Sequence, residues 1–140
     1  MDDKLNIMLE ALANSIDSLF PSVPVFKEDV PDSLPEKCFI ISYAGDVDVK
    51  KQCPRLYRIS GSFDISYFSE SNTFSQRAEF NSVFLSLSLN MQMISKSDMK
   101  IRLNNHISRT VDNVLHDICA FDTFLRVDDD TEFIQTIERT

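Results

Sequence analysis

The stretch that decides the fold is Arg55–Phe68, which reads RLYRISGSFDISYF. From Ser62 to Tyr67 polar and apolar residues alternate, and the apolar ones are Phe63, Ile65 and Tyr67. A period of two is typical of a β-strand that packs one face on a core and exposes the other. The pattern therefore predicts a long strand over 55–68, and Gly61 within it predicts a β-bulge.

Further strands are predicted upstream of this stretch. The apolar run Cys38–Tyr43 predicts one strand. From Ala44 to Lys51 valines alternate with charged residues, which predicts that this strand continues into an exposed hairpin tip, ended by Pro54. The short run Val23–Phe26 contains a proline and predicts at most an edge strand, followed by a loop over 28–37.

Two stretches have the spacing of amphipathic helices. Residues 3–20 repeat apolar side chains at helical intervals until Pro21, and these residues are Leu5, Met8, Leu9, Leu12, Ile16, Leu19 and Phe20. Residues 72–90 predict a second helix with a broad apolar side, formed by Phe74, Ala78, Phe80, Phe84, Leu85 and Leu89.

The C-terminal part predicts a hairpin. Lys100–Leu103 predicts a short strand, and His106–Val111 and Val114–Val127 predict two strands joined at Asp112-Asn113, residue types that tolerate the left-handed backbone of a tight turn. Both faces of the last strand are partly apolar. That pattern predicts a sheet covered on both sides, by a helix and by a neighbouring molecule.

The predicted fold is therefore α+β, with two helices packed on a mostly antiparallel sheet of four to five strands. The element order is α-β-β-α-β-β, with one small strand added near the front. Residues 1–127 form a single domain in this interpretation, and 128–140 form an acidic C-terminal arm. That arm is either a short surface helix or frayed end, or a segment that orders on a partner.

Composition limits the function classes. The chain has 140 residues and a net charge of −8, and this sign disfavours tight binding to nucleic acid. Three cysteines without a CxxC motif predict a reducing compartment rather than a disulfide framework. No apolar run reaches the roughly 20 residues that a membrane span needs, so we expect no membrane association.

The sequence predicts no catalytic, metal or cofactor site. It contains no phosphate-binding glycine loop, nucleophile elbow or HExxH motif. His116 and Cys119 are three residues apart on one strand and therefore face opposite sides, so they cannot share a metal ion. His106 lies in another strand, where only the strand register could bring it near either residue.

Charges of both signs occur close together in the predicted hairpin. Its tip carries Asp46, Asp48, Lys50 and Lys51. One interpretation is an exposed ribbon whose polar edge prevents aggregation. The other is a self-complementary strip that meets a copy of the same chain.

Three segments together resemble the phage tail terminator family of long-tailed phages and of defective phage-like elements in Gram-positive bacteria. They are Glu28–Val30 with Pro35–Ile41, Arg55–Arg58 with Ser62–Phe68, and Val111–His116 with Phe121–Leu125. Asn113 stands where the family pattern leads us to expect glycine, and Met99–Ser108 matches poorly. The resemblance covers nearly the whole chain, from the first helix to about Val127.

The resemblance implies a structural role without catalysis. Such proteins form a ring, typically of six copies, on the head-proximal end of the tail tube. The ring stops tube polymerisation and offers a surface to the neck, and DNA passes through its lumen without specific binding. The implied partners are further copies of the chain, the tube protein and a neck connector protein. The implied location is the virion tail, assembled in the cytoplasm of a bacterial host.

Candidate interface residues follow from the charged hairpin and the arm. They are Asp46, Asp48, Lys50, Lys51, Arg55, Arg58, Asp128, Asp129, Asp130 and Phe133. Two other functions remain open on the sequence alone: a neck or head–tail connector subunit, and an acidic inhibitor of a host protein. An enzyme is the least favoured, because no set of His, Cys and carboxylate residues has a usable spacing.

Overall fold

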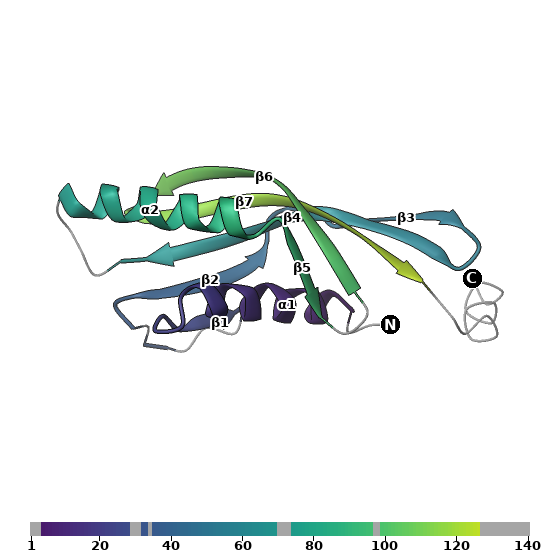
Figure 1. Cartoon of the computed structure of the whole chain (residues 1–140), viewed down its shortest axis with the longest axis horizontal. Helices are drawn as coiled ribbons and strands as arrows, with labels where there is room; N and C mark the ends of the chain where they lie inside the picture. The colour runs from purple at the N-terminus through teal and green to yellow at the C-terminus, as the bar shows by residue number, and fades with distance from the viewer. Residues whose placement is uncertain (1–3, 29–31, 34, 70–73, 97–98, 127–140) are drawn as a thin grey trace.

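The computed structural model describes residues 4–28, 32–33, 35–69, 74–96 and 99–126 (Figure 1). Its elements in chain order are α1 (Lys4–Leu19), β1 (Val25–Lys27), β2 (Cys38–Tyr43), β3 (Asp48–Cys53), β4 (Leu56–Phe68), α2 (Phe74–Asn90), β5 (Met93–Lys96), β6 (Met99–Val111) and β7 (Val114–Arg126). The predicted arm, 128–140, lies outside the described residues.

All described strands belong to one sheet. Its order is β1-β2-β4-β7-β6-β5, and β3 pairs with β4 beside the end of β2. Only β1 and β2 run parallel, and the other pairs are antiparallel. The α+β class is therefore confirmed. The predicted four to five strands and the order α-β-β-α-β-β are wrong, because the sheet has seven strands and four of them precede α2.

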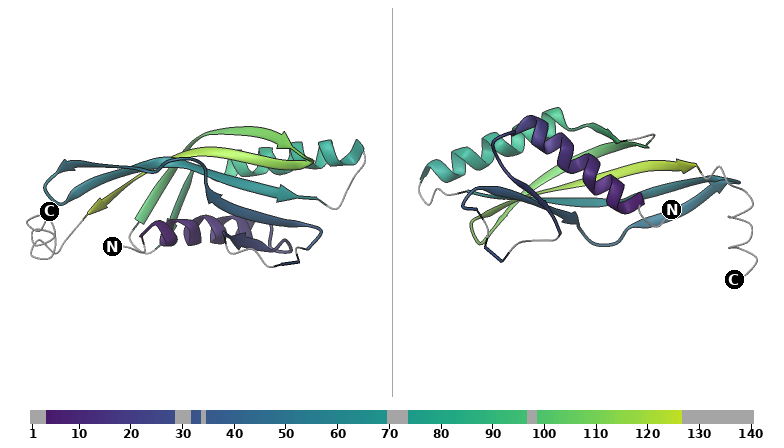
Figure 2. Two further views of the ribbon diagram at one scale, coloured as in Figure 1. Left: turned by 180° about the vertical axis from the view of Figure 1, so that it is seen from behind. Right: turned by 90° about the horizontal axis from the view of Figure 1, so that it is seen from below.

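Helix α1 bridges the two ends of the strand order. It contacts β1 at one edge and β5 at the other, so the sheet curls around it (Figure 2). Its buried residues are Met8, Leu9, Ala11, Leu12 and Ile16. Their spacing places them on one side of the helix, which explains why the sequence pattern predicted this element correctly.

Helix α2 packs on the same concave face of the sheet. Phe80, Val83 and Leu87 join the residues of α1 in one continuous core. The Tyr67 hydroxyl of β4 donates a hydrogen bond of 2.7 Å to Glu79 of α2, and its ring meets Phe80 edge-on. Leu85 and Leu89, expected on the apolar side of this helix, are instead more than half exposed.

The long strand predicted over 55–68 is confirmed as β4. Phe63, Ile65 and Tyr67 are all buried at its inner face. The bulge predicted at Gly61 is wrong, because the register of β4 with β7 runs unbroken through Gly61↔Phe121. Glycine is needed there for a close approach: a Cβ atom would lie 3.1 Å from both the Asp46 carbonyl oxygen and the Phe121 ring.

Three other boundaries differ from the prediction. The tip expected within 44–51 lies later, at Pro54-Arg55, because 48–53 forms the separate strand β3. Arg55 has a φ of 70° after the fixed φ of a proline, the combination that a type II turn uses. The edge strand expected at 23–26 is β1, Val25–Lys27, and β5 was not predicted.

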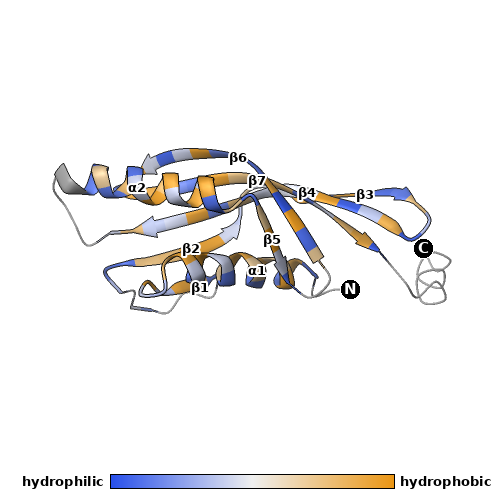
Figure 3. Cartoon of the chain, viewed as in Figure 1, coloured by the Kyte–Doolittle hydropathy of each residue, from blue (hydrophilic) through white to orange (hydrophobic). Residues whose placement is uncertain are grey.

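The C-terminal hairpin is confirmed, with one irregularity. The strands predicted at 100–103 and 106–111 are a single strand, β6, with a bulge between Asn104 and His106. Asp112 and Asn113 both have positive φ, as the predicted turn requires. Figure 3 shows apolar and polar residues alternating along the first part of β6, next to β5.

Neither described helix covers the convex face of the sheet. Ile107 and Phe124 lie on that face and are each 54% exposed. Ile107 pairs in register with the half-buried Ile118. Cover on this face by a neighbouring molecule therefore remains a prediction.

Candidate assembly surfaces

Strand β3 is the most exposed element of the described chain. All six residues of β3 are exposed. Figure 1 shows β3 extending beyond both helices, together with the adjoining ends of β4 and β7. Within the described residues β3 pairs only with β4, so its other edge is open. An open edge offers backbone donors and acceptors to a further strand.

The structure places the six predicted hairpin residues on or next to the β3–β4 ribbon, which consists of Asp48–Cys53 paired with Leu56–Ser60. Asp48, Lys50 and Arg58 share its convex face, since Asp48 pairs with Ser60 and Lys50 with Arg58. Lys51 points to the other face, and Asp46 and Arg55 lie just outside the two strands. The Lys50 ammonium lies 3.8 Å from the Asp48 carboxylate, and both side chains are well exposed. The other four predicted residues, Asp128, Asp129, Asp130 and Phe133, lie outside the described residues.

Arg58 has a partner that the sequence did not reveal. The Asp122 carboxylate lies 3.3 Å from both Arg58 and Arg102 and also accepts a hydrogen bond from Asn104. Burial opposes ionisation of Asp122, but the hydrogen bonds and charges of the two arginines outweigh it and lower its pKa. Two cations on one carboxylate leave a positive cluster on the convex face of an acidic protein. Only the strand register joins these residues, so no spacing could have predicted the cluster.

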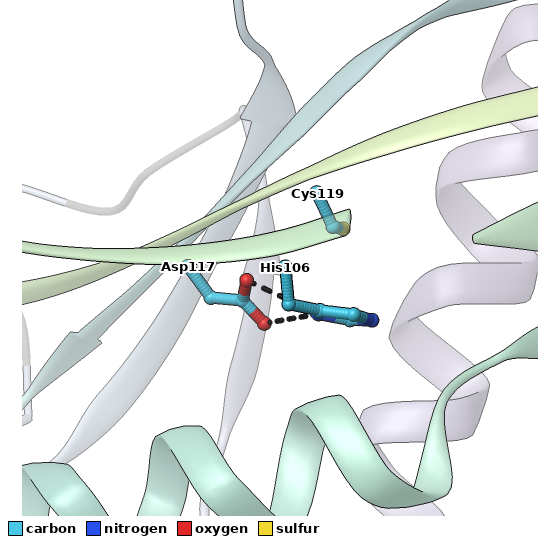
Figure 4. Close-up of side chains that lie close together, drawn as sticks. All are labelled: His106, Asp117 and Cys119. Atoms are coloured by element: carbon cyan, nitrogen blue, oxygen red, sulfur yellow. Dashed lines mark hydrogen bonds and ion pairs between the residues drawn. The ribbon is translucent and has the colours of Figure 1, made fainter. Parts of the chain in front are cut away.

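A second missed cluster lies inside the sheet (Figure 4). The bulge before His106 turns its side chain to the concave face, where it pairs in register with Cys119. His106 Nδ1 lies 2.8 Å from Asp117, and its Nε2 lies 3.0 Å from the Met91 carbonyl oxygen. Asp117 and Cys119 are fully buried. The sequence signal for this cluster was Asp117, an acidic residue among the inward-facing side chains of β7.

The protonation of this cluster follows from its contacts. Burial alone would lower the pKa of His106, but the hydrogen bond and charge of Asp117, with the Met91 carbonyl, outweigh it and raise the pKa. Both ring nitrogens face acceptors, which suits a doubly protonated imidazolium. Burial, with Asp117 beside it, raises the pKa of the Cys119 thiol. His106 and Asp117 therefore form a buried ion pair, and the Cys119 thiol lies beside it.

The same three residues are the candidate metal ligands of the described chain. Their donor atoms all lie within 4.8 Å of one another. A structural zinc site takes four ligands, usually with several thiolates, whereas this cluster offers three donors, of which only one is a thiol. The donor set therefore fits an ion pair better than a zinc ion. His116 and Cys119 do face opposite sides of β7, as predicted from their spacing.

Ser66, His116 and Asp64 form a third polar group, on the convex face. Both the Ser66 hydroxyl and the Asp64 carboxylate lie 3.0 Å from the same ring atom, His116 Nδ1. A catalytic triad needs the acid on one ring nitrogen and the nucleophile on the other. This arrangement therefore cannot relay a proton from the hydroxyl and ties three strand residues together instead.

The described surface offers an open strand edge, a projecting ribbon and an uncovered sheet face, which are features of a protein that acts through contacts with other proteins. The chain matches the model of a family described as "Phage tail terminator protein" over residues 8–132. It therefore belongs to the phage tail terminator family and is a structural component of a phage tail. The matched range includes Asp128–Asp130. A search of curated proteins finds no match.

Membership of this family fixes the general role. The family is structural, and its members work in contact with other tail components. Its place is the tail of the virion. None of the helices within the described ranges has the length and apolar character to cross a lipid bilayer.

Proposed function

We propose that this chain closes into a ring, of six copies, on the head-proximal end of the tail tube. There the ring stops tube polymerisation and provides the surface that joins the neck and head. Family membership supports the location. The observation that carries the ring is the β3–β4 ribbon, whose wholly exposed strand and open edge form a surface that a neighbouring copy can cover.

A ring requires two different patches on each copy. In a head-to-tail contact, one patch of a molecule meets the other patch of the next, and closure follows from the rotation between them. The ribbon lies at one end of the sheet. The unpaired part of β6 and the bare convex face extend towards the other end (Figure 1). These positions suit a heterologous contact.

The charge of the chain suits passage of DNA through the ring. A net charge of −8 provides few favourable contacts for phosphates, so DNA could slide without being held. In this proposal the lumen makes no specific contact with bases.

Electron microscopy of tails assembled without this protein tests the role. We expect tubes of uncontrolled length that fail to join heads. Tubes of normal length that fail only to join heads would identify a neck connector instead. Tails of normal length that join heads would exclude both roles.

Charge reversal on the ribbon tests the proposed contact. Asp48→Lys and Lys50→Glu should each weaken self-association in sedimentation velocity. Each substitution reverses one charge of the exposed Asp48–Lys50 pair, which in this proposal meets complementary charges on the neighbouring copy. Asp17→Lys, at an exposed position of α1, is the matched control and should leave self-association unchanged. Equal association of all four proteins would show that the ribbon is not part of the interface.

A further inference from the structure

One edge of the sheet stays open along most of β6. Strand β5 pairs only with Met99–Arg102, and the last bond on that side runs from the Leu103 amide to the Gln92 carbonyl. Within the described chain, Asn104–Val111 pair with β7 alone. A second strand edge is therefore open at the end of the sheet away from the ribbon.

A groove lies where this edge begins. It has a volume of about 590 Å³ and runs between α2 and β6. Phe84 and Ser88 of α2 form one wall, and Arg102, Leu103 and Asn104 form the other. Met93, which also lines it, is 57% exposed, so an apolar side chain is available there for a partner.

The strand beside the groove is basic. β6 carries Lys100, Arg102 and Arg109 and no acidic residue, although the protein as a whole is strongly acidic. Arg102 is bound to Asp122, whereas no carboxylate of the described chain pairs with Lys100 or Arg109. An acidic segment with apolar residues would complement both the charge and the groove.

The chain's own C-terminal segment has this chemistry. Residues 127–140 contain five acidic residues and one arginine, and the apolar side chains Phe133, Ile134 and Ile137 follow the run Asp128–Asp130. The segment starts after Arg126, which pairs with Leu56 at the base of the hairpin turn. Arg102, at the near end of the groove, pairs with Asp122, four residues back along β7. His106, at its far end, pairs with Cys119, seven residues back, or about 23 Å at the usual rise of a strand. β7 thus ends, at Arg126, beside the ribbon and beyond the groove of its own molecule.

We propose that residues 127–140 of one copy dock on the open edge of β6, with Phe133 in the groove, of the next copy in the ring. This contact rests on the proposed ring and names one of its interfaces. The acidic run meets Arg109 on the open edge, and the apolar residues that follow cover Phe84 and Met93. It joins opposite ends of successive molecules, as a head-to-tail interface requires.

Disulfide trapping between full-length copies tests the proposal. All proteins carry Cys53→Ser, which removes the exposed cysteine and keeps the buried Cys38 and Cys119. Phe133→Cys and Met93→Cys variants are mixed in equal amounts and oxidised. We expect a covalent dimer that forms at least five times faster than with the matched partner Leu85→Cys, which is equally exposed but does not line the groove.

Charge reversal gives an independent readout. Arg109→Glu should slow trapping roughly threefold, the scale of one exposed ion pair, and Asp129→Lys in the Phe133→Cys partner should restore it. Equal trapping at 85 and 93, or trapping only within one chain that carries both cysteines, would overturn the proposal. If rings form without trapping at 93, this contact is wrong and the proposed function stands. If no rings form and tails without the protein are normal, both are wrong.

Discussion

The Nδ1 atom of His106 lies 2.8 Å from the Asp117 carboxylate, and the two side chains are 7% and 0% exposed. They belong to neighbouring strands and are brought together by the bulge in β6. The other ring nitrogen reaches the Met91 carbonyl, at the corner between α2 and β5. One imidazole thus joins β6, β7 and the end of α2 at the floor of the groove.

We expect the stability of the protein to fall as the pH rises above about 6.5. The pKa of His106 is raised in the folded state, so its contribution is complete below the unfolded value of about 6.5 and is lost as the pH passes the folded value. Urea unfolding between pH 6 and pH 9 measures this dependence. The His106→Gln variant should show a flatter profile. The same slope in both proteins would contradict the assignment.

Removing one partner of the buried His106–Asp117 pair should strongly destabilise the folded protein. Asp117→Leu leaves a buried cation without its partner, and we expect a loss of about 3–5 kcal/mol in the free energy of unfolding. Replacing both partners, with His106→Leu and Asp117→Leu together, should recover a large part of that loss. Chemical denaturation at pH 6 of the wild type, the two single variants Asp117→Leu and His106→Leu, and the double variant measures it. A double variant as unstable as the sum of the singles would rule out the pair.

Gly61→Ala should destabilise the protein by about 1–3 kcal/mol, because the new methyl group overpacks against the Asp46 carbonyl and the Phe121 ring. Ser60→Ala, the preceding residue of β4, is the control and should change stability little. Thermal unfolding of both variants compares them. An unchanged Gly61→Ala protein would mean that the segment around Asp46 moves aside at no cost.

The turn between β6 and β7 can be improved. Asn113 has a φ of 63°, a conformation that glycine adopts without strain. We expect Asn113→Gly to stabilise the protein by about 0.5 kcal/mol, whereas the β-branched Asn113→Val should destabilise it by about 1–2 kcal/mol. Differential scanning calorimetry of both variants tests the order. The opposite order would show that the Asn113 side chain makes a contact that outweighs its backbone strain.

Local patterns predicted much of the fold. Helix α1, the long strand β4 and the turn at Asp112-Asn113 each follow from residues close together in the chain. β5 was missed because four residues are too few for a periodicity to show. β3 was predicted as a continuation of β2 because only a single glycine, Gly45, marks the break between Tyr43 and Asp48. Gly45 has a φ of 76°.

The polar clusters could not be predicted in the same way. Asp122 binds Arg58 and Arg102 through the registers of two strand pairs, and neither register can be read from the sequence. His106 reaches Asp117 only because one extra residue in β6 reverses which side chains face inward. The ribbon residues were identified from their charge alone, and their exposure followed from the position of β3 beyond the helices.

The thirteen residues of β4 run without interruption from the ribbon to the core, and β7 accompanies them from Leu56 to Tyr67. A neighbour that pulled on the ribbon along the strand direction would load those hydrogen bonds in shear, all at once rather than one after another. A force that one copy exerts on another would thus be transmitted along β4 to the core around Phe63. A ring of copies joined in this way would resist the outward force of DNA that passes through it under pressure.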